Sequence, residues 1–227
     1  HRLGSIRMNF VFCYFRPENK FPSRVFGGVT ENTKDPKGCS LDTFAYFHYQ
    51  KIFNKELKLP EPWKLMKTQP EDLLELKNFY EHSSGGLMLN ALELEQSSEN
   101  LDELSKEYQI LGLKRERHLV KLKKDGRVKE VVMINISDIG LNLADLTSTL
   151  QVIVVDSDGF TKEIFHLMVS ELSAQFEQDD IPVLLYPVAY AENHSIPYEK
   201  RYNLWVLNMQ YTDHYFRHLK GLFKETH

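Results

Sequence analysis

Hydrophobic residues along the chain follow both strand-like and helix-like spacings, which predicts a mixed α/β protein. Continuous apolar runs at residues 8–14, 149–156 and 181–189 are typical of buried strands. Residues 117–136 alternate apolar and polar positions around Asp125-Gly126, which indicates a β-hairpin. An amphipathic pattern between Ile164 and Phe176 predicts a helix directly after the strand at 149–156.

The remaining segments complete the predicted order of elements. Thr68, followed by Pro70 and Glu71, predicts a helix that begins with Thr68 as its N-cap. A short helix at 87–94, a Tyr-rich helix at 198–207 and an aromatic strand at 211–223 are also expected. From residue 68 the order is therefore helix, helix, hairpin, strand, helix, strand, helix, strand.

The two ends of the chain resemble each other. An apolar strand, a Glu-Asn pair, an apolar-Pro pair and an Asp-led aromatic stretch occur in this order from residue 10 to 48 and again from residue 183 to 218. We therefore expect residues 1–50 to be the C-terminal half of a first repeat, 51–67 a linker rich in Lys and Pro, and 68–227 a complete second domain. The chain opens with His1 and enters an apolar run almost at once, so we expect preceding residues in the full-length protein.

Composition excludes several classes of function. The chain has 227 residues, 28 Lys and Arg against 32 Asp and Glu, and a net charge of −4, which gives no general electrostatic footprint for nucleic acid. Two cysteines are too few for a disulfide framework or a four-cysteine zinc site and favour a reducing compartment. His214 and His218 share a helical spacing, but no nearby carboxylate or cysteine completes a metal site. The apolar runs are too short for a membrane span, and we expect a cytoplasmic protein without a metal.

Asn193 and the stretch Tyr198-Glu199-Lys200-Arg201-Tyr202 carry a family resemblance. They resemble the Asn … Tyr-Glu-Lys-x-Gly-Phe stretch of the GNAT acyltransferase superfamily, whose order of elements is similar to that predicted from residue 68 onward. The resemblance implies a mixed, largely antiparallel central sheet with helices on both faces. It also implies that Asn193 holds the pantetheine arm of the donor and that Tyr198 protonates the departing thiolate. The candidate general bases for an amine are Glu192 and Glu199, and the sequence alone does not choose between them.

The same resemblance assigns the turn at 156–161 to donor binding. In the family, backbone N–H groups of this turn hold a pyrophosphate, which implies roles for Ser157 and Gly159. Backbone N–H groups of the preceding strand, at Val154 and Val155, would polarise the thioester carbonyl. Both roles require that the strands at 149–156 and 183–189 diverge. A structural alternative makes Ser157 or Asp158 the N-cap of the following helix.

Two classes of function stay open from the sequence. The first is an acyltransferase that moves an acyl group from acyl-CoA or an acyl-carrier protein to an amine or amino acid. The second is a non-catalytic ligand-binding or regulatory protein of the same fold, which the carboxylates Asp156 and Asp158 favour because they repel a pyrophosphate. Asn135, Ser137 and Gly140 also resemble the second motif of cyclic di-GMP-binding PilZ domains. A half-domain with open strand edges further suggests a homodimer.

Overall fold

The computed structural model describes residues 9–33, 35–48, 58–84, 86–92, 94, 106, 108–137, 148–173 and 183–224. Its strands are β1 (Phe10–Phe15), β2 (Cys39–Phe47), β3 (Trp63–Lys67), β4 (Arg115–Lys124), β5 (Arg127–Ser137), β6 (Thr149–Val154), β7 (Val183–Pro187) and β8 (Lys200–Asn208). Its helices are α1 (Lys20–Pro22), η2 (Ser23–Gly27), α2 (Gly28–Thr33), α3 (Pro70–Ser84), α4 (Leu87–Ala91), α6 (Lys162–Ser173), α7 (Val188–Asn193), η4 (Met209–Tyr211) and α8 (Thr212–Lys224).

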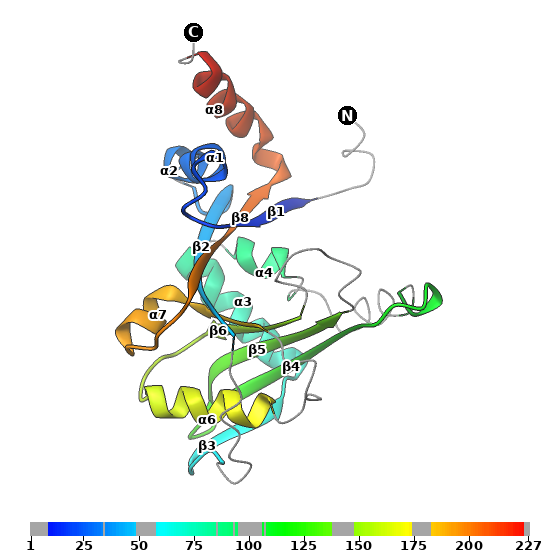
Figure 1. Cartoon of the computed structure of the whole chain (residues 1–227), viewed down its shortest axis with the longest axis vertical. Coiled ribbons are helices and arrows are strands. Elements are labelled where there is room, and N and C mark those ends of the chain that lie inside the picture. The colour runs from blue at the N-terminus through cyan, green and yellow to red at the C-terminus, as the bar shows by residue number, and fades with distance from the viewer. Residues whose placement is uncertain are drawn as a thin grey trace. The chain divides into compact units, whose positions relative to one another are not determined.

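A mixed sheet with helices on both faces organises these elements, as the sequence predicts (Figure 1). Within the described residues the sheet has eight strands in the order β1-β8-β2-β7-β6-β5-β4-β3. The chain divides into two compact units. We call residues 1–44, 73–95 and 201–227 the terminal unit, and residues 45–72 and 96–200 the central unit. Strands β2 and β8 contribute residues to both units.

The central unit is built on antiparallel pairing from β3 to β6. The predicted hairpin is confirmed: β4 and β5 are joined by Asp125 and Gly126, whose φ angles of 50° and 80° place both residues in the left-handed region that this type of two-residue turn requires. Strand β7 then joins β6 in parallel. A parallel neighbour requires a crossover connection, and the segment that contains α6 provides it.

Helix α6 covers one face of the central sheet. Its buried residues recur at helical spacing and pack on strand residues that point to the same side. Phe165 lies at the centre of this core, with its ring 4.9 Å from that of Tyr186, 6.0 Å from Phe47 and 6.4 Å from Phe160 (centroid to centroid). This aromatic cluster joins the helix to two different strands of the unit.

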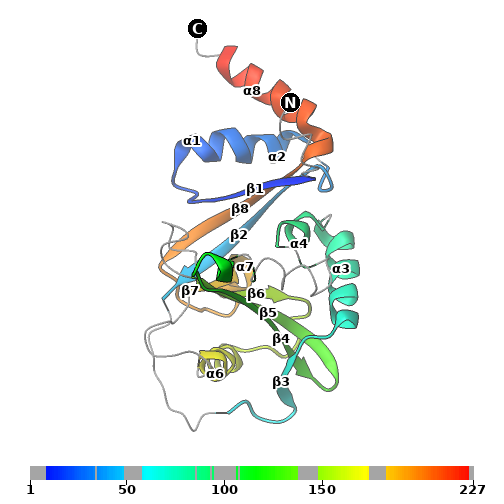
Figure 2. The same cartoon turned by 90° about the vertical axis from the view of Figure 1, so that its right-hand side faces the viewer.

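The terminal unit has its own core. Strand β1 pairs with β8 in antiparallel register from Phe10 opposite Asn208 to Phe15 opposite Asn203. Figure 2 shows the helices α1 and α2 on one side of these strands and α4 on the other. The core on the α2 side consists of buried apolar residues from four elements: Phe15, Val29, Cys39, Trp205 and Leu207.

Two sequence predictions near the C-terminus are wrong. The predicted helix at 198–207 is strand β8, and the predicted strand at 211–223 is helix α8. Strand β8 is a central strand buried on both faces, so it lacks the alternation that identifies a half-exposed strand. In α8 the aromatic residues favour a strand by propensity, but Tyr215, Leu219 and Leu222 follow the helical period.

Two smaller predictions also need correction. The predicted linker at 51–67 ends in strand β3. The N-terminus of α3 is not a capping box of Thr68 and Glu71, since Asp72 Oδ2 accepts from the Gln69 amide at 2.7 Å. The same carboxylate pairs with Lys121, which satisfies a buried ammonium group of β4.

The predicted repeat is only partly matched by secondary structure. Its two apolar runs form β1 and β7, but Asp42 lies within strand β2 whereas Asp213 lies in the first turn of α8. The two Asp-led stretches are therefore not equivalent, and the boundaries at 50 and 68 stay a prediction. None of the helices in the described ranges is long and apolar enough to cross a membrane.

The aromatic cluster provides a test of the fold. Replacing Phe165 with Ala removes a buried ring from the contact between α6 and the sheet, and we expect the free energy of unfolding to fall by about 3–5 kcal/mol. Phe21, which is 70% exposed, is the matched control, and its replacement by Ala should change stability by less than about 0.5 kcal/mol. Urea unfolding followed by circular dichroism measures both; equal losses would contradict the assigned core.

Candidate functional site

The parallel strands β6 and β7 separate partway along their length. Their pairing comprises Thr149 with Val183, Leu150 with Leu184 and Gln151 with Leu185. Beyond this point β6 continues to Val154 in register with β5. The divergence of these two strands, which the sequence resemblance required, is therefore present.

Two local features explain why the strands separate. Pro187 comes directly after Tyr186. Because proline has no N–H, it cannot donate a hydrogen bond to a neighbouring strand. On the other side, the amides of Val155 and Asp156 both donate to the carbonyl of Lys129, at 2.9 and 3.0 Å. This doubled contact sets two residues against one residue of β5, as in a β-bulge, and it keeps the end of β6 bonded to β5.

The same contact distinguishes the two predicted carbonyl-binding amides. Because the Val155 amide donates to Lys129, it points toward β5. N–H directions alternate along a strand, so the Val154 amide points toward the β7 side, where the strands separate. Of these two predicted donors, Val154 is the one whose amide points to the β7 side, and its side chain is buried in the hydrophobic core there.

A buried polar pair lies where the strands part. The hydroxyl of Tyr186 on β7 donates to Glu130 Oε1 on β5 at 3.2 Å, although β6 lies between those strands in the sheet. Glu130 has no exposed surface, and its Oε2 has no hydrogen-bond partner. Burial raises the pKa of Glu130 to about 8, and it also raises the pKa of Tyr186.

The predicted donor-binding turn follows β6 directly. Gly159 has a φ of 71°, and the turn leads into α6. Thr161, rather than Ser157 or Asp158, caps this helix: its Oγ1 accepts from the Ile164 amide at 3.3 Å. The amides of the first helical turn are therefore placed at the end of this turn, beside Gly159.

Two lysines of the β4–β5 hairpin reach this turn. Lys129 Nζ lies 2.5 Å from Asp156 Oδ2, and this hydrogen bond is the main reason why the pKa of Asp156 is lowered. Lys124 Nζ lies so close to Gly159 that a Cβ added there would approach it to 2.2 Å. The acidic turn is thus accompanied by cations that are distant in sequence, and its carboxylate at Asp156 is neutralised.

The two predicted catalytic residues are in contact. The Tyr198 hydroxyl donates to Glu192 Oε1 at 2.9 Å. Tyr198 packs against the same hydrophobic cluster that contains Val154 and Tyr186, while Glu192 is exposed. Asn193, the predicted pantetheine-binding residue, is exposed at the C-terminus of α7 beside Glu192.

Sequence reasoning missed a second hydrogen-bonded group of titratable residues. Glu199 Oε2 lies 3.1 Å from His48 Nδ1, and His48 Nε2 lies 3.2 Å from the hydroxyl of the buried Tyr46. The backbone amide of His48 donates to Glu199 Oε1 and lowers the pKa of Glu199. Glu199, the alternative general base, is therefore tied to His48, which was unpredictable because the two residues are 151 positions apart.

Two basic side chains of β4 are engaged within the protein. Arg117 donates to the Asn135 side chain at 3.0 Å, and Lys124 lies over the Trp63 ring. The Asn135 side chain also donates to Thr149, so this residue of the PilZ-like motif links β5 to β6 within the sheet. Gly140 of that motif lies outside the described residues.

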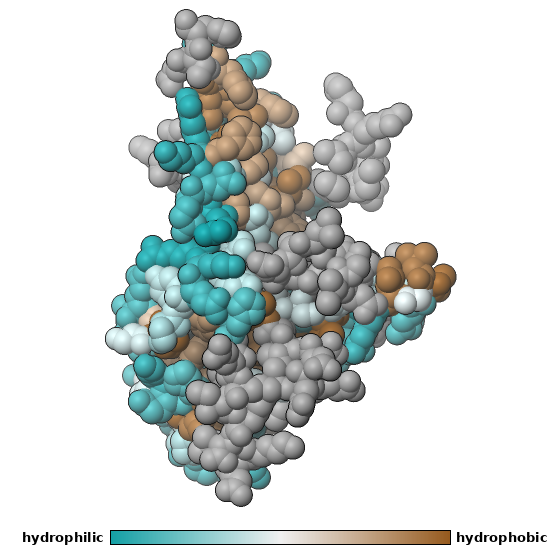
Figure 3. All heavy atoms as spheres, in the orientation of Figure 1, coloured by the Kyte–Doolittle hydropathy of each residue, from teal (hydrophilic) through white to brown (hydrophobic). Residues whose placement is uncertain are grey.

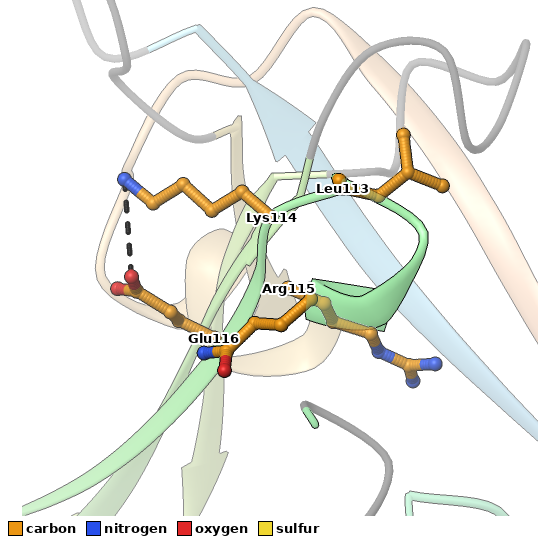
Figure 4. A pocket seen from close by; sticks show the side chains of 6 residues that line it. Leu113, Lys114, Arg115 and Glu116 are labelled. Atoms are coloured by element: carbon orange, nitrogen blue, oxygen red, sulfur yellow. Dashed lines mark ion pairs between the residues drawn. The ribbon is translucent and has the colours of Figure 1, made fainter. Parts of the chain in front are cut away.

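A small polar pocket of about 300 Å³ lies at the start of β4 (Figure 4). Figure 4 shows Lys114 turned toward Glu116, with 4.0 Å between Nζ and Oε1, while Arg115 points away from them. The Arg115 guanidinium lies over the ring of Tyr108. Because these charges pair with each other or with an aromatic ring, we assign no reaction to this pocket.

Metal and thiol chemistry find little support in the described parts of the chain. Within those ranges, no three His, Cys, Asp or Glu side chains are grouped so that they could hold a metal ion. Burial raises the pKa of Cys13 to about 11 and also raises the pKa of Cys39. Neither thiol is activated as a nucleophile, because only the thiolate form reacts readily.

Comparisons with known proteins give only distant structural likenesses. No protein-family model matches the chain, and no curated protein matches its sequence. The structure is similar to a GCN5-related N-acetyltransferase-like protein from Streptococcus suis, with 14% identity, a TM-score of 0.42, and coverage of 85% of this chain and 70% of that one. A functionally unknown conserved protein from Staphylococcus epidermidis is similar with 9% identity and a TM-score of 0.42, and the match covers 88% of this chain and 73% of that one. A possible acetyltransferase from Clostridium difficile is similar with 17% identity and a TM-score of 0.31, and the match covers 60% of this chain and 91% of that one.

The Glu130 carboxyl group makes stability depend on pH. The folded protein holds a proton on Glu130 that the unfolded chain releases above its ordinary pKa of 4.5, so rising pH favours unfolding until the folded pKa of about 8 is passed. Between pH 5 and 8, the unfolding free energy of the native protein should fall on the order of 2–4 kcal/mol more than that of Glu130→Gln. The raised pKa of Asp42, about 6, is common to both proteins and cancels.

Urea unfolding at pH 5, 6.5 and 8 measures this difference. Glu75→Gln, an exchange at an exposed carboxylate, should keep the pH dependence of the native protein. If the unfolding free energies of the native protein and Glu130→Gln changed equally with pH, Glu130 would not be a buried neutral acid.

Proposed function

We propose that the protein is an N-acyltransferase that moves an acyl group from a thioester donor to an amine. The donor is acyl-CoA or an acyl-carrier protein, and the acceptor is a small-molecule amine or an amino acid. The observation that carries this proposal is the separation of β6 and β7 after three residue pairs. A thioester requires an N–H donor for its carbonyl oxygen, and backbone amides of β6 beyond Gln151 would supply it.

The turn after β6 supports the binding of the donor's phosphate. Lys124 lies beside Gly159, and the N-terminus of α6 directs backbone N–H groups and the positive end of a helix dipole to the same turn. Lys129 neutralises Asp156, which reduces the repulsion between that carboxylate and a phosphate. Both donor types have a phosphate on the pantetheine arm, so this site alone does not select between them.

The contact between Tyr198 and Glu192 supports a closed path for the protons. The amine nitrogen attacks the thioester carbonyl carbon, and the C–N bond forms as the C–S bond breaks. Glu192 takes the proton that the amine loses, and Tyr198 gives its hydroxyl proton to the departing thiolate. Because the two side chains are 2.9 Å apart, Tyr198 can regain a proton from Glu192, which returns both residues to their starting states.

A non-catalytic ligand-binding protein is the second candidate. It is favoured by the engagement of the Val155 amide and the Asp156 carboxylate with Lys129, since both are groups of the predicted donor site. In this case the opening between β6 and β7 would hold an acyl or nucleotide ligand without transfer.

Release of free thiol tests the first candidate. The protein is incubated with acetyl-CoA, long-chain acyl-CoA or acyl-carrier protein and a pool of amino acids and amines, and thiol is measured with a chromogenic disulfide. We expect release that Tyr198→Phe slows by roughly 10²-fold, because the thiolate then departs without a proton. Tyr202→Phe, four positions further along, is the matched control and should keep the native rate. Donor binding without thiol release for any donor would favour the second candidate.

Lys124 tests the donor site separately from the chemistry. We expect Lys124→Gln to raise the KM for the donor roughly tenfold with little change in kcat, since one charge-assisted contact to phosphate is lost. Lys123→Gln removes the neighbouring charge and is the matched control. A fall in kcat at unchanged KM would contradict a role of Lys124 in donor binding.

A further inference from the structure

Helix α8 in the terminal unit has two chemically distinct sides. With 3.6 residues per turn, its apolar side chains fall on one side and its charged side chains on the other. The apolar side consists of Tyr215, Phe216, Leu219, Leu222 and Phe223. This pattern is typical of a helix that lies at the boundary between a polar and an apolar phase.

The terminal unit covers only part of this apolar side. Tyr215 packs against Trp205 with 5.6 Å between ring centroids, and on the same flank His218 lies close to Gly28. Phe216 and Phe223, which are one heptad apart, remain 56% and 63% exposed. Figure 3 shows apolar side chains exposed along α8. Two exposed phenylalanines on one ridge form a patch that needs an explanation, since scattered single residues are the normal case.

The exposed ridge is bordered by cations. Arg217, Lys220 and Lys224 are exposed on α8, and Asp213 is the only carboxylate among residues 212–224. The whole chain, in contrast, has a net charge of −4. The net charge of α8 is thus opposite in sign to that of the whole chain. Its cations and its aromatic ridge together are complementary to a surface that is both anionic and apolar.

We propose that α8 docks on an anionic lipid surface, with Phe216 and Phe223 inserted among the acyl chains and the three cations at the level of the lipid phosphates. A second copy of the helix fits less well, because it would bring like charges together. An acidic protein would need a groove shaped for the ridge, whereas a bilayer presents both chemistries in one plane.

This docking is independent of the proposed acyl transfer. Its residues belong to the terminal unit, while Tyr198, Glu192 and Lys124 belong to the central unit. Lipid binding therefore remains testable whether or not the protein releases thiol.

Sedimentation with vesicles is the direct experiment. The protein is mixed with phosphatidylcholine vesicles that contain either no phosphatidylglycerol or about 30% of it, and the bound fraction is measured against lipid concentration. We expect binding roughly 10²-fold tighter to the anionic vesicles, since each of three cations contributes about a factor of five to ten near such a surface. Raising salt from about 0.1 M to about 0.5 M should remove most of this difference.

Variants separate the apolar from the ionic contribution. Phe216→Ser with Phe223→Ser should weaken binding to anionic vesicles roughly tenfold or more, and the triple exchange Arg217→Glu, Lys220→Glu, Lys224→Glu should abolish it. Phe21→Ser is the control for the first variant, because Phe21 is exposed in the same unit but lies on α1. Lys58→Glu, Lys64→Glu and Lys67→Glu, at three exposed positions of the central unit, form the control for the second.

Each outcome decides the proposal. Circular dichroism of every variant shows first whether α8 and the rest of the chain are folded. Absence of binding to anionic vesicles, or binding that the α8 variants leave unchanged, would overturn it. Sedimentation velocity tests the remaining alternative, a dimer formed through α8. A dimer that dissociates when Phe216 and Phe223 are both replaced by Ser would show that a second copy of the chain covers this ridge.

Discussion

Parallel strands remain together only while their slanted hydrogen bonds continue, and in this protein the ladder between β6 and β7 ends at Gln151 and Leu185. Two features near that point oppose its continuation. Pro187 cannot donate to β6, and the Lys129 carbonyl holds Val155 and Asp156 on the β5 side. The separation of the two strands is therefore encoded by backbone chemistry on both of them.

The separation of β6 and β7 also explains an otherwise costly group in the core. Tyr186 reaches Glu130 across the position of β6, and this contact bridges the strands where their backbones no longer pair. A fully buried carboxyl group with one unsatisfied oxygen is tolerable only in its neutral form, as its raised pKa indicates. Ionisation would place a charge beside the Phe165 cluster. The neutral Glu130–Tyr186 pair therefore links β5 to β7 at the point where β6 and β7 separate.

Local patterns predicted local structure well, and long-range contacts were beyond them. The hairpin at Asp125-Gly126 depends on residues close in sequence, so spacing and turn chemistry were sufficient to predict it. Lys129 meets Asp156 across 27 positions and His48 meets Glu199 across 151, and no pattern within one segment encodes such contacts. The exchange of strand and helix at β8 and α8 had another cause: burial on both faces hid the period of β8, and aromatic propensity outweighed the helical period of α8.

The same misread helix shows how one pattern can serve two purposes. In α8 the apolar side chains exceed what the terminal unit covers: Tyr215 meets the core at Trp205, while Phe216, the next residue, is mostly exposed. A helix that served only the fold would lose little stability from a polar residue at position 216, because a mostly exposed phenylalanine contributes little to folding. Phe216 and the neighbouring cations are therefore better explained by a surface outside the chain than by the core beneath the helix.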